Sequence, residues 1–560
     1  MKKYLIALSA LAFATTSCYE KLNIAPPNAI TNEQVQELLK TADDETIETI
    51  LGAIANTLKP EMYGSGYNFR YSGNLDGTWS GQFIARLSCG NDIVEGNWQN
   101  PGDDYYNGEN ITGETNANNP SWWHRAFRMT TTANKAATMI NEELIAENPS
   151  NLLKKYLGEI YVIRAFGYLY AQETFGTNSL GMPIYTKYDI SQPAVARASA
   201  KETLDSVIRW ATRADALFEA AGVGFKATPA SDLTRGLTNY VIARAALLAV
   251  EAEGANASTY FATASAACDK MLGAGASLMT EEQYVQKQSG VTTIEGADYP
   301  VWKAATSGFM NFELNPEALY GFGWQYGGGG QIVTYANTWG GSYRIDDRLY
   351  DKIDPNDYRK DNFHVDRPAD FPTISYAGAS SFIDGGTSEV PTYWTSKFTN
   401  NVGLGGEVGN SNVTVRNRVD YAFIRLSEIY LMKAEIQART GDEGGAKNTL
   451  NTLLNARTKA GATPLTCDNY QGMSGLSALQ MVQLQSRIEL WGEYGRLFDV
   501  RRLGQGIDRR TDDGFSEECI SMMNRRNVNI TKADTYDWVL TIPKAELDAN
   551  PNINEEDQNP

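Results

Sequence analysis

Pairs of amphipathic helices are the feature that most constrains how this chain folds. Apolar residues recur every three to four positions over residues 423–439 and, after a GDEGG turn, again over 446–457. This spacing predicts two successive helices, and small Ala434 and Ala438 allow them to approach closely. Such a helix, turn and helix is typical of a tetratricopeptide-like pair. The same periodicity predicts helices over residues 31–58 with a break near Asp43, and over 122–145, 152–175, 201–221, 237–254, 260–272 and 476–502.

Local signals indicate where the first helix begins and how the chain continues after the last one. The helices vary in length, which favours an all-α stack of pairs over a regular solenoid. Thr31, after Pro26 and Pro27, is the predicted cap of the first helix. Near the C-terminus, DWVLTIP predicts a short strand, PKAEL a turn and NPNINEEDQNP an extended tail. Four tryptophans lie in helical patterns and are predicted core residues, namely Trp122, Trp123, Trp210 and Trp491.

The helical pattern stops between about residues 281 and 420, where Gly, Pro, Tyr and Trp dominate. The densest part is YGFGWQYGGGGQIVTYANTWGGSY, residues 320–343. Glycines clustered this closely mark loops, or places where another molecule approaches the backbone. The interleaved rings either contact that molecule or fold back onto the core. A second loop-rich region, residues 63–120, is also long enough to favour a functional role.

The two loop regions contain the residue types that a glycan site needs. Sugar rings present C–H faces to flat aromatic side chains, and their hydroxyls need carboxylate, amide or guanidinium partners. The predicted ligand-binding residues are the rings of Trp324, Tyr326 and Trp339, joined across space by Trp98, with Asp92, Asn97 and Asn337 as polar partners.

The N-terminus has the pattern of an export signal. Lys2 and Lys3 precede an apolar run over residues 4–14, and small polar residues separate that run from Cys18. The run is shorter than the ~20 residues that span a bilayer. A cysteine in this position predicts lipidation of Cys18 and a membrane anchor of acyl chains. The alternative is an ordinary secretory signal with an incidental cysteine.

Charge and cysteine content exclude several classes of partner. The formal charge of -18 repels phosphate backbones, so nucleic acid is not an expected partner. The other cysteines, Cys89, Cys268, Cys467 and Cys519, form no CxxC pair, which argues against zinc and redox motifs. Disulfides and buried free thiols both remain open for these four residues.

Signals for catalysis are weak. The two histidines, His124 and His364, are accompanied by no GxSxG or HExxH motif, and no spacing singles out a carboxylate pair for glycoside hydrolysis. The acidic run RIDDRLYDKIDPNDYRKDN, residues 344–362, lacks the glycine and the closing glutamate of an EF-hand loop, so we expect a solvated turn region. No metal, cofactor or enzymatic activity is predicted.

Several of these segments, taken in order, resemble the SusD/RagB family of outer-membrane lipoproteins of Bacteroidetes. They are Cys18 with LNIAPPNAIT, then WWHRAFRMTTTANKAATMI, GEIYVIRAFGYLYAQETFG, RVDYAFIRLSEIYLMKAEI, RIELWGEYGRLFDVRRLG and IPKAELDANPNI. The resemblance runs the whole length of the chain. It implies about four tetratricopeptide-like helix pairs that support an irregular, loop-rich face.

The resemblance also implies a function. Family members capture nutrients outside the cell, cap a TonB-dependent transporter of the SusC type and pass it glycan or, in the RagB branch, peptide. On this basis we expect a non-catalytic glycan-binding lipoprotein at the outer membrane, facing the cell exterior, with peptide capture as the alternative and a surface hydrolase as a third hypothesis. The expected divisions are a signal peptide (1–17), a lipid-anchored tether (18–30), an N-terminal helical part (31–280), a loop-rich insert (281–420) and a C-terminal helical part (421–560).

Overall fold

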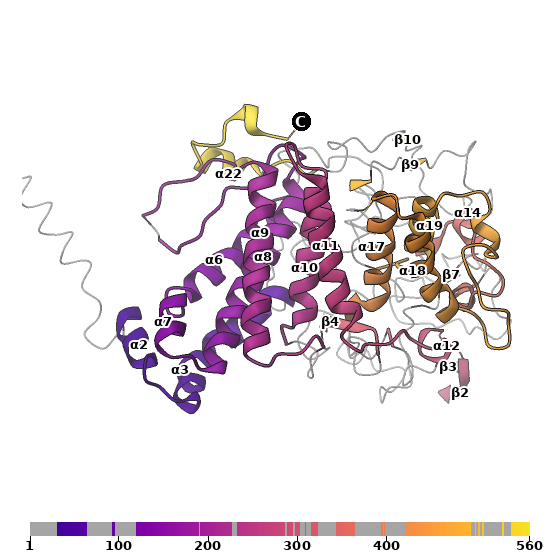
Figure 1. Cartoon of the computed structure of the whole chain (residues 1–560), viewed down its shortest axis with the longest axis horizontal. Helices are drawn as coiled ribbons and strands as arrows, with labels where there is room; N and C mark the ends of the chain where they lie inside the picture. Colours follow the sequence, from indigo (N-terminus) through magenta and orange to yellow (C-terminus); the bar gives the residue numbers. More distant parts are fainter. Residues whose placement is uncertain are drawn as a thin grey trace, which may run out of the picture.

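A stack of α-helices runs through the molecule (Figure 1). The computed structural model describes residues 31–63, 92–95, 119–189, 191–226, 232–285, 288–294, 297–302, 308–309, 315–322, 343–364, 394–395, 397, 421–493, 499, 502–503, 507–508, 529–530 and 539–559. The longer helices described are α2 (Asn32–Leu39), α3 (Asp44–Tyr63), α6 (Asn119–Ala136), α8 (Asn151–Phe175), α9 (Ala200–Ala220), α10 (Arg235–Ala249), α11 (Ala257–Leu272), α17 (Leu426–Arg439), α18 (Glu443–Ala456) and α19 (Ala478–Glu489). The shorter ones are α7 (Glu142–Glu147), α12 (Glu281–Tyr284), α14 (Asp347–Tyr350), α22 (Lys544–Ala549) and the 3-10 turns η4 (Tyr358–Asn362), η5 (Gln471–Met473) and η6 (Glu555–Asp557).

Helices that are neighbours in sequence pack side by side along the stack. Helix α6 contacts α8, α8 contacts α9, α9 contacts α10, and α10 contacts α11. The stack continues from α11 to α17, which contacts both α18 and α19. This arrangement confirms the predicted all-α scaffold of tetratricopeptide-like helix pairs. The four tryptophans predicted to be core residues are all buried: Trp122, Trp123, Trp210 and Trp491.

Helix α8 is enclosed because apolar and aromatic side chains occur on all its sides. Ser150 caps its first turn by accepting backbone N–H bonds, and α3, α6, α9 and α10 contact it. Two glycines let its neighbours approach closely. A Cβ at Gly158 would lie 2.7 Å from the Phe218 ring of α9, and one at Gly167 would lie 2.9 Å from Thr130 of α6. The spacing of α8 from both neighbours therefore depends on these glycines.

Most predicted helices are present within a few residues of their expected bounds. Thr31 caps α2 with a capping box to Gln34, and the predicted break separates α2 from α3. Two boundaries were predicted wrongly. Residues 122–145 form two helices, because the chain turns after α6 and Asn141 caps α7. Residues 423–425 belong to strand β8, so α17 starts later than predicted.

The C-terminal region departs further from the prediction. The helix predicted over 476–502 ends at Glu489, after which Gly492 adopts a φ of 72° that turns the chain. Residues 539–543 are irregular rather than a strand, and α22 occupies the predicted turn. The tail after it contains η6 rather than being fully extended.

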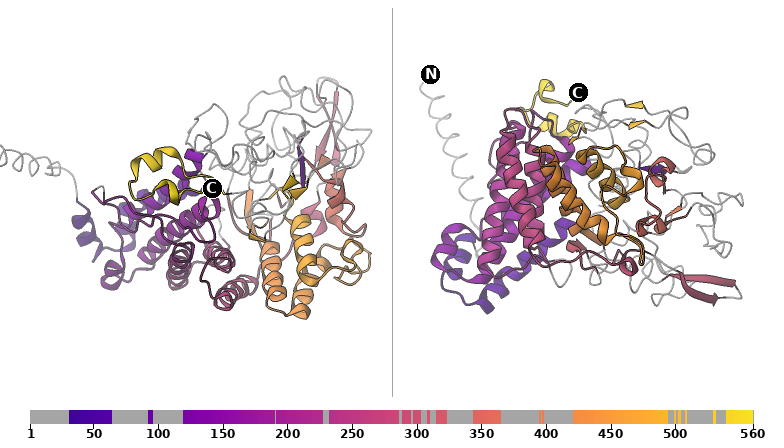
Figure 2. Two further views of the ribbon diagram at one scale, coloured as in Figure 1. Left: turned by 90° about the horizontal axis from the view of Figure 1, so that it is seen from above. Right: turned by 45° about the vertical axis from the view of Figure 1, so that its right-hand side comes forward.

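This C-terminal segment packs against the N-terminal helices (Figure 2). The Leu540 N–H donates to the Thr174 carbonyl at 3.0 Å, and Asn559 Nδ2 donates to the Phe175 carbonyl at 2.8 Å. Arg197 donates to the carbonyls of Phe175 and Asp557. The C-terminal segment and the N-terminal helices therefore form one packed unit at the C-terminal end of α8.

The described strands are short and pair antiparallel. One sheet has the order β1-β5-β7-β6, and the pairs β4-β8, β2-β3 and β9-β10 stand apart from it. The strands are β1 (Ile93–Glu95), β2 (Gln288–Ile294), β3 (Ala297–Trp302), β4 (Ala318–Phe322), β5 (Tyr343–Ile345), β6 (Phe363–His364), β7 (Trp394–Thr395), β8 (Tyr421–Arg425), β9 (Ile507–Asp508) and β10 (Asn529–Ile530). Most of these strands come from the predicted loop-rich insert, so that insert has regular structure at several of its anchor points.

Candidate functional site

The glycine- and aromatic-rich stretch, residues 320–343, begins in one strand pair and ends in another. Its first residues are in β4, which pairs with β8 in a register that shifts around Tyr320. The Tyr320 side chain is fully buried and makes an edge contact with the Phe423 ring at 6.3 Å. Tyr320 therefore belongs to the core, as one of the two interpretations of this stretch expects. Tyr343, its last residue, begins β5.

Strands β1 and β5, which belong to the two predicted binding regions, pair with each other. They pair antiparallel, with Ile93 opposite Ile345 and Glu95 opposite Tyr343. The chain leaves β1 after Glu95 and enters β5 at Tyr343, so both connections start from the same end of the ladder. The segments that contain Trp98 and Trp339 are thus tethered within a few residues of a shared pair.

Asp92 is the one predicted ligand-binding residue within the described segments. It is 5% exposed, and its Oδ1 accepts a hydrogen bond from Arg487 Nε at 2.6 Å. Its carbonyl accepts bonds from the Trp491 indole at 2.8 Å and from the Asp346 N–H at 3.1 Å. These contacts fix the start of β1 on α19 and β5. The remaining predicted site residues lie outside the described residues: Cys18, Asn97, Trp98, Trp324, Tyr326, Asn337 and Trp339.

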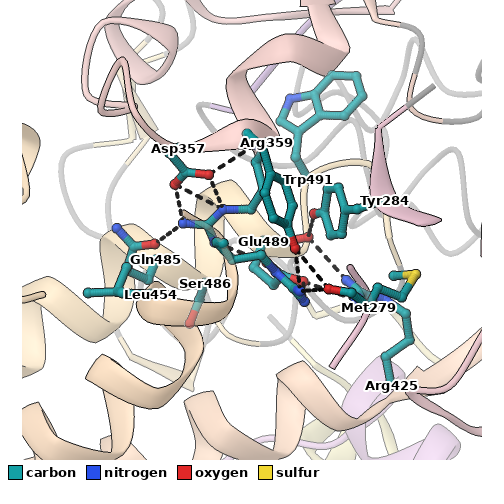
Figure 3. Close-up of polar contacts among 12 residues, drawn as sticks. Met279, Tyr284, Asp357, Arg359, Arg425, Leu454, Gln485, Ser486, Glu489 and Trp491 are labelled. Atoms are coloured by element: carbon teal, nitrogen blue, oxygen red, sulfur yellow. Dashed lines mark hydrogen bonds and ion pairs between the residues drawn. The ribbon is translucent and has the colours of Figure 1, made fainter. Parts of the chain in front are cut away.

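A buried group of charged residues lies where the strands meet the last helices (Figure 3). We call it the arginine–glutamate cluster, and its members are Glu317, Asp357, Arg359, Lys397, Arg425, Arg457, Glu489 and Glu493. The four cationic and four anionic side chains balance one another. Each is less than a tenth exposed.

Glu489 is the centre of this cluster. Its carboxylate accepts hydrogen bonds from Arg359 at 3.0 Å, from Arg425 at 3.0 Å, and from Arg457 at 2.9 and 3.0 Å. Glu317 accepts from both Arg425 and Arg457 at 2.6 Å. Burial alone would raise the pKa of Glu489, but the surrounding guanidinium groups hold that pKa well below its usual value. The carboxylate therefore stays ionised.

The cluster fixes the ends of several strands to the helices. Glu317 precedes β4, Arg425 ends β8, and Arg359 lies just before β6. Lys397, just after β7, donates to Glu493 at 2.6 Å and to the carbonyls of Glu489 and Trp491. Because breaking a buried ion pair from one side typically costs about 3–5 kcal/mol, these contacts resist displacement of the strands.

The acidic run over residues 344–362 is only partly the solvated turn region that we predicted, because Asp351, Lys352 and Asp361 are exposed but other charged residues are buried. Asp357 and Arg359 are buried and paired, with Asp357 also accepting from the Tyr470 hydroxyl at 2.9 Å. Asp346 is fully buried and binds Arg348. The prediction was wrong for these residues because charge usually marks an exposed surface, whereas here the buried acids have cationic partners brought close by the fold.

The described residues offer no arrangement typical of metal or redox chemistry. Among them, no three His, Cys, Asp or Glu side chains gather in a way that could hold a metal ion. Cys268 and Cys467 are buried free thiols, and burial raises the pKa of the Cys467 thiol to about 11. Across the same segments, no helix combines the length and hydropathy needed to cross a membrane.

The sequence from residue 281 to 560, half of the chain, matches the model of the SusD family. The chain belongs to the SusD family. That match contains the glycine- and aromatic-rich stretch, all eight members of the arginine–glutamate cluster and the last helices of the stack. No protein with a curated description matches the sequence.

Solved SusD-like structures share the fold over nearly the whole length. A SusD-like carbohydrate binding protein from Bacteroides vulgatus superposes with a TM-score of 0.64 at 19% identity, covering 91% of this chain and 97% of that one. A SusD superfamily protein from Bacteroides thetaiotaomicron gives 0.62 at 18% identity, covering 91% and 99%. Surface glycan-binding protein A from Bacteroides uniformis gives 0.59 at 16% identity, covering 92% and 99%. At these identities the likeness establishes the SusD fold.

Sequence reasoning missed the residues that hold the SusD-like strands in place. Arg425 stands in the apolar run YAFIRL, and Glu489 stands between Ile488 and Leu490. Charged residues inside apolar runs are a signal for buried ion pairs, since an isolated charge there would be costly. The partners come from segments far apart in sequence, so the signal identifies candidates without pairing them.

Proposed function

We propose that this SusD family protein is a non-catalytic glycan-binding lipoprotein of the outer membrane, which delivers oligo- or polysaccharide to a SusC-like TonB-dependent transporter. The binding face consists of the loops that flank β1 and β5. Trp324, Tyr326 and Trp339 stack on sugar rings, with Trp98 from the second loop. Asn97 and Asn337 bind hydroxyl groups.

The observation that carries this proposal is the pairing of Glu95 with Tyr343. It tethers the chain leading to Asn97 and Trp98 beside the chain that comes after Trp339. A residue of extended chain spans at most about 3.6 Å, so three or four residues keep these side chains within reach of one ligand. Asp92 takes a supporting role in the proposal, because it already binds Arg487.

A binding role is further supported by the state of the buried acids. Glu317 and Glu489 of the cluster are fully buried, and each contacts at least two guanidinium groups. A general acid or base must reach the substrate and exchange a proton with it. Carboxylates that are fully buried and paired with arginines are expected to stabilise a rigid support for a binding face.

The domain divisions belong to the same proposal. The helical parts, residues 31–280 and 421–560, form the scaffold and residues 281–420 carry the binding face. The packing of residues 539–559 on α8 indicates that the two helical parts act as one support. A transporter partner would then meet a rigid body that presents the binding loops.

A panel of polysaccharides and peptides tests the function directly. The chain from Tyr19 onward, which contains every described element, is titrated with each ligand while released sugars or cleaved peptides are monitored. Saturable binding of a polysaccharide without product supports the proposal. Binding of peptides alone would assign peptide capture instead, and saccharide turnover would show a hydrolase.

Trp324→Ala tests the stacking platform. Loss of one aromatic contact is expected to weaken glycan affinity by about five- to tenfold, with the melting temperature within about 1 °C of the native protein. Tyr188→Ala is the control, because Tyr188 is a 41% exposed aromatic in the connection between α8 and α9. The affinity of the Tyr188→Ala variant for the glycan should equal that of the native protein. Lowered stability with intact binding in Trp324→Ala would instead place that ring in the core.

Cys18→Ala tests the anchor. Without the acylated cysteine, the protein should move from the membrane fraction to the soluble fraction after cell lysis, because acyl chains supply the membrane affinity. Immunoblotting of the two fractions measures the shift. Equal retention of the native protein and the variant would contradict lipidation at Cys18.

A further inference from the structure

An arginine to which the described residues give no acidic partner is buried between helices α8 and α9. Arg164 is 5% exposed, and its guanidinium carbon lies 5.6 Å from the Tyr161 ring centre and 5.5 Å from that of Trp210. Within the described part of the chain, its Nε is buried without a hydrogen-bond partner. The two helices run side by side here (Figure 1), and Trp210 also packs against Tyr168.

A second arginine shares the same indole ring. The guanidinium carbon of Arg209 lies 5.7 Å from the Trp210 ring centre, and its Nη2 contacts only the Ser206 hydroxyl, at 3.2 Å, among the described residues. Arg209 is exposed. Two positive charges therefore lie close to one aromatic ring, and no carboxylate of the described segments pairs with either.

An acid beside Tyr161 is already bound elsewhere. Glu142 of α7 forms a two-point pair with Arg213, at 2.8 and 2.6 Å. Burial lowers the pKa of Arg164, and the phenols of Tyr161 and Tyr168 are the groups that oppose this shift. The guanidinium stays charged, but the described residues do not supply the anion that normally accompanies a buried arginine.

We propose that Arg164 and Arg209 form a carboxylate-binding site on the α8–α9 face, separate from the glycan-binding loops. Aromatic contacts offset part of the cost of burying a guanidinium, but they leave its N–H donors without acceptors. A carboxylate supplies two acceptor oxygens in the plane of the guanidinium fork, which is the geometry that arginine binds best. Arg164 keeps a small exposed area and Arg209 beside the same ring is exposed, so a carboxylate would approach the pair from the side of Arg209.

The carboxylate could come from a free small acid or from a Glu or Asp side chain of a polypeptide. Binding depends on short-range contacts, since the formal charge of -18 repels anions at a distance. Moderate salt, which screens that repulsion, should therefore weaken the site less than it weakens an ordinary surface ion pair.

Titration with sodium succinate at constant ionic strength tests the site, monitored by NMR or calorimetry on the chain from Tyr19 onward. A capped peptide containing Glu and its Gln counterpart form the second arm. Succinate is expected to bind saturably, and Arg164→Gln and Arg209→Gln should each weaken it about tenfold. Stronger binding of the Glu peptide than of succinate would identify a polypeptide source; succinate alone would identify a free acid.

Lys154→Gln is the matched control, since it removes one positive charge from the same helix at a residue whose amine contacts the Asn151 side chain. Its affinity for succinate should equal that of the native protein. The proposal is overturned if neither probe saturates, or if Lys154→Gln loses as much affinity as Arg164→Gln. Arg209 is exposed, so Arg209→Gln decides the matter even if Arg164→Gln fails to fold. Glycan binding is expected to survive all three changes.

Discussion

At the scale of single residues, most buried charges in the described part of this protein are neutralised, but Glu159 in α8 is an exception. It is fully buried, and neither of its carboxylate oxygens has a hydrogen-bond partner among the described residues. Burial raises the pKa of Glu159 to about 7, although Lys59 and Lys155 oppose the shift. Below that pH the folded protein prefers the protonated acid, in contrast to Glu489, which three arginines keep ionised.

Replacing Glu159 with Gln should make the protein less sensitive to alkaline pH. The Glu159 carboxyl has a pKa near 4.5 in the unfolded chain and near 7 in the folded protein. The free energy of unfolding of the native protein therefore falls as the pH rises between these two values, and it stays lower above pH 7. The free energy of unfolding of Glu159→Gln, relative to the native protein, should rise by about 2–3 kcal/mol between pH 5 and pH 8. Urea unfolding at both pH values measures it. An identical difference at pH 5 and pH 8 would show that Glu159 does not titrate in this range.

At the scale of elements, the strands near the binding loops are very short and owe their position to other segments. Strand β1 has three residues and, among the described strands, pairs only with β5, while β5 also meets β7. Three residues bury too little surface to be stable alone. Contacts of Asp92 with Arg487 and Trp491 hold β1 against α19. These contacts therefore anchor the start of β1 beside α19.

A disulfide across this ladder tests the register. Glu95→Cys combined with Tyr343→Cys should form a crosslink on mild oxidation, because directly opposed residues in an antiparallel pair have Cα atoms about 4.5–5.5 Å apart. Peptide mapping by mass spectrometry identifies it. Ile93→Cys with Tyr343→Cys places the thiols two positions out of register and should not crosslink. Equal yields from both pairs would refute the assigned register.

The elements that sequence reasoning predicted are those whose signals are local. Apolar spacing and caps such as Thr31 and Ser150 lie inside or beside their own helices, so most helices were predicted within a few residues. Strand β1 pairs with a segment about 250 residues later, and no local pattern specifies that partner. The candidate site shares this limit. The composition of the loops predicts an aromatic binding region, whereas the buried pairing of Asp92 with Arg487 is seen only in the folded structure.

At the scale of the whole molecule, the C-terminal segment packs against the N-terminal helices. The C-terminal segment contributes Leu540 and Ile542, both buried, to the body formed by the N-terminal helices. Arg197 fastens it by donating to the carbonyls of Gly181, Phe175 and Asp557. A support in which the C-terminal segment is joined to the N-terminal helical part in this way resists separation of the two, which suits a protein that presents loops to a ligand and a partner.

Arg197→Ala should loosen this packing. The change removes four hydrogen bonds, to three backbone carbonyls and to Asn559, and leaves their acceptors without that donor, so the free energy of unfolding should fall by about 2–4 kcal/mol. Limited proteolysis should also release residues 539–560 faster. Arg213→Ala is the control, because the Arg213–Glu142 pair is 46% and 44% exposed and should contribute less than about 1 kcal/mol. If both variants lost the same stability and residues 539–560 were cleaved at the native rate, Arg197 would not be the residue that holds the C-terminal segment on the N-terminal helices.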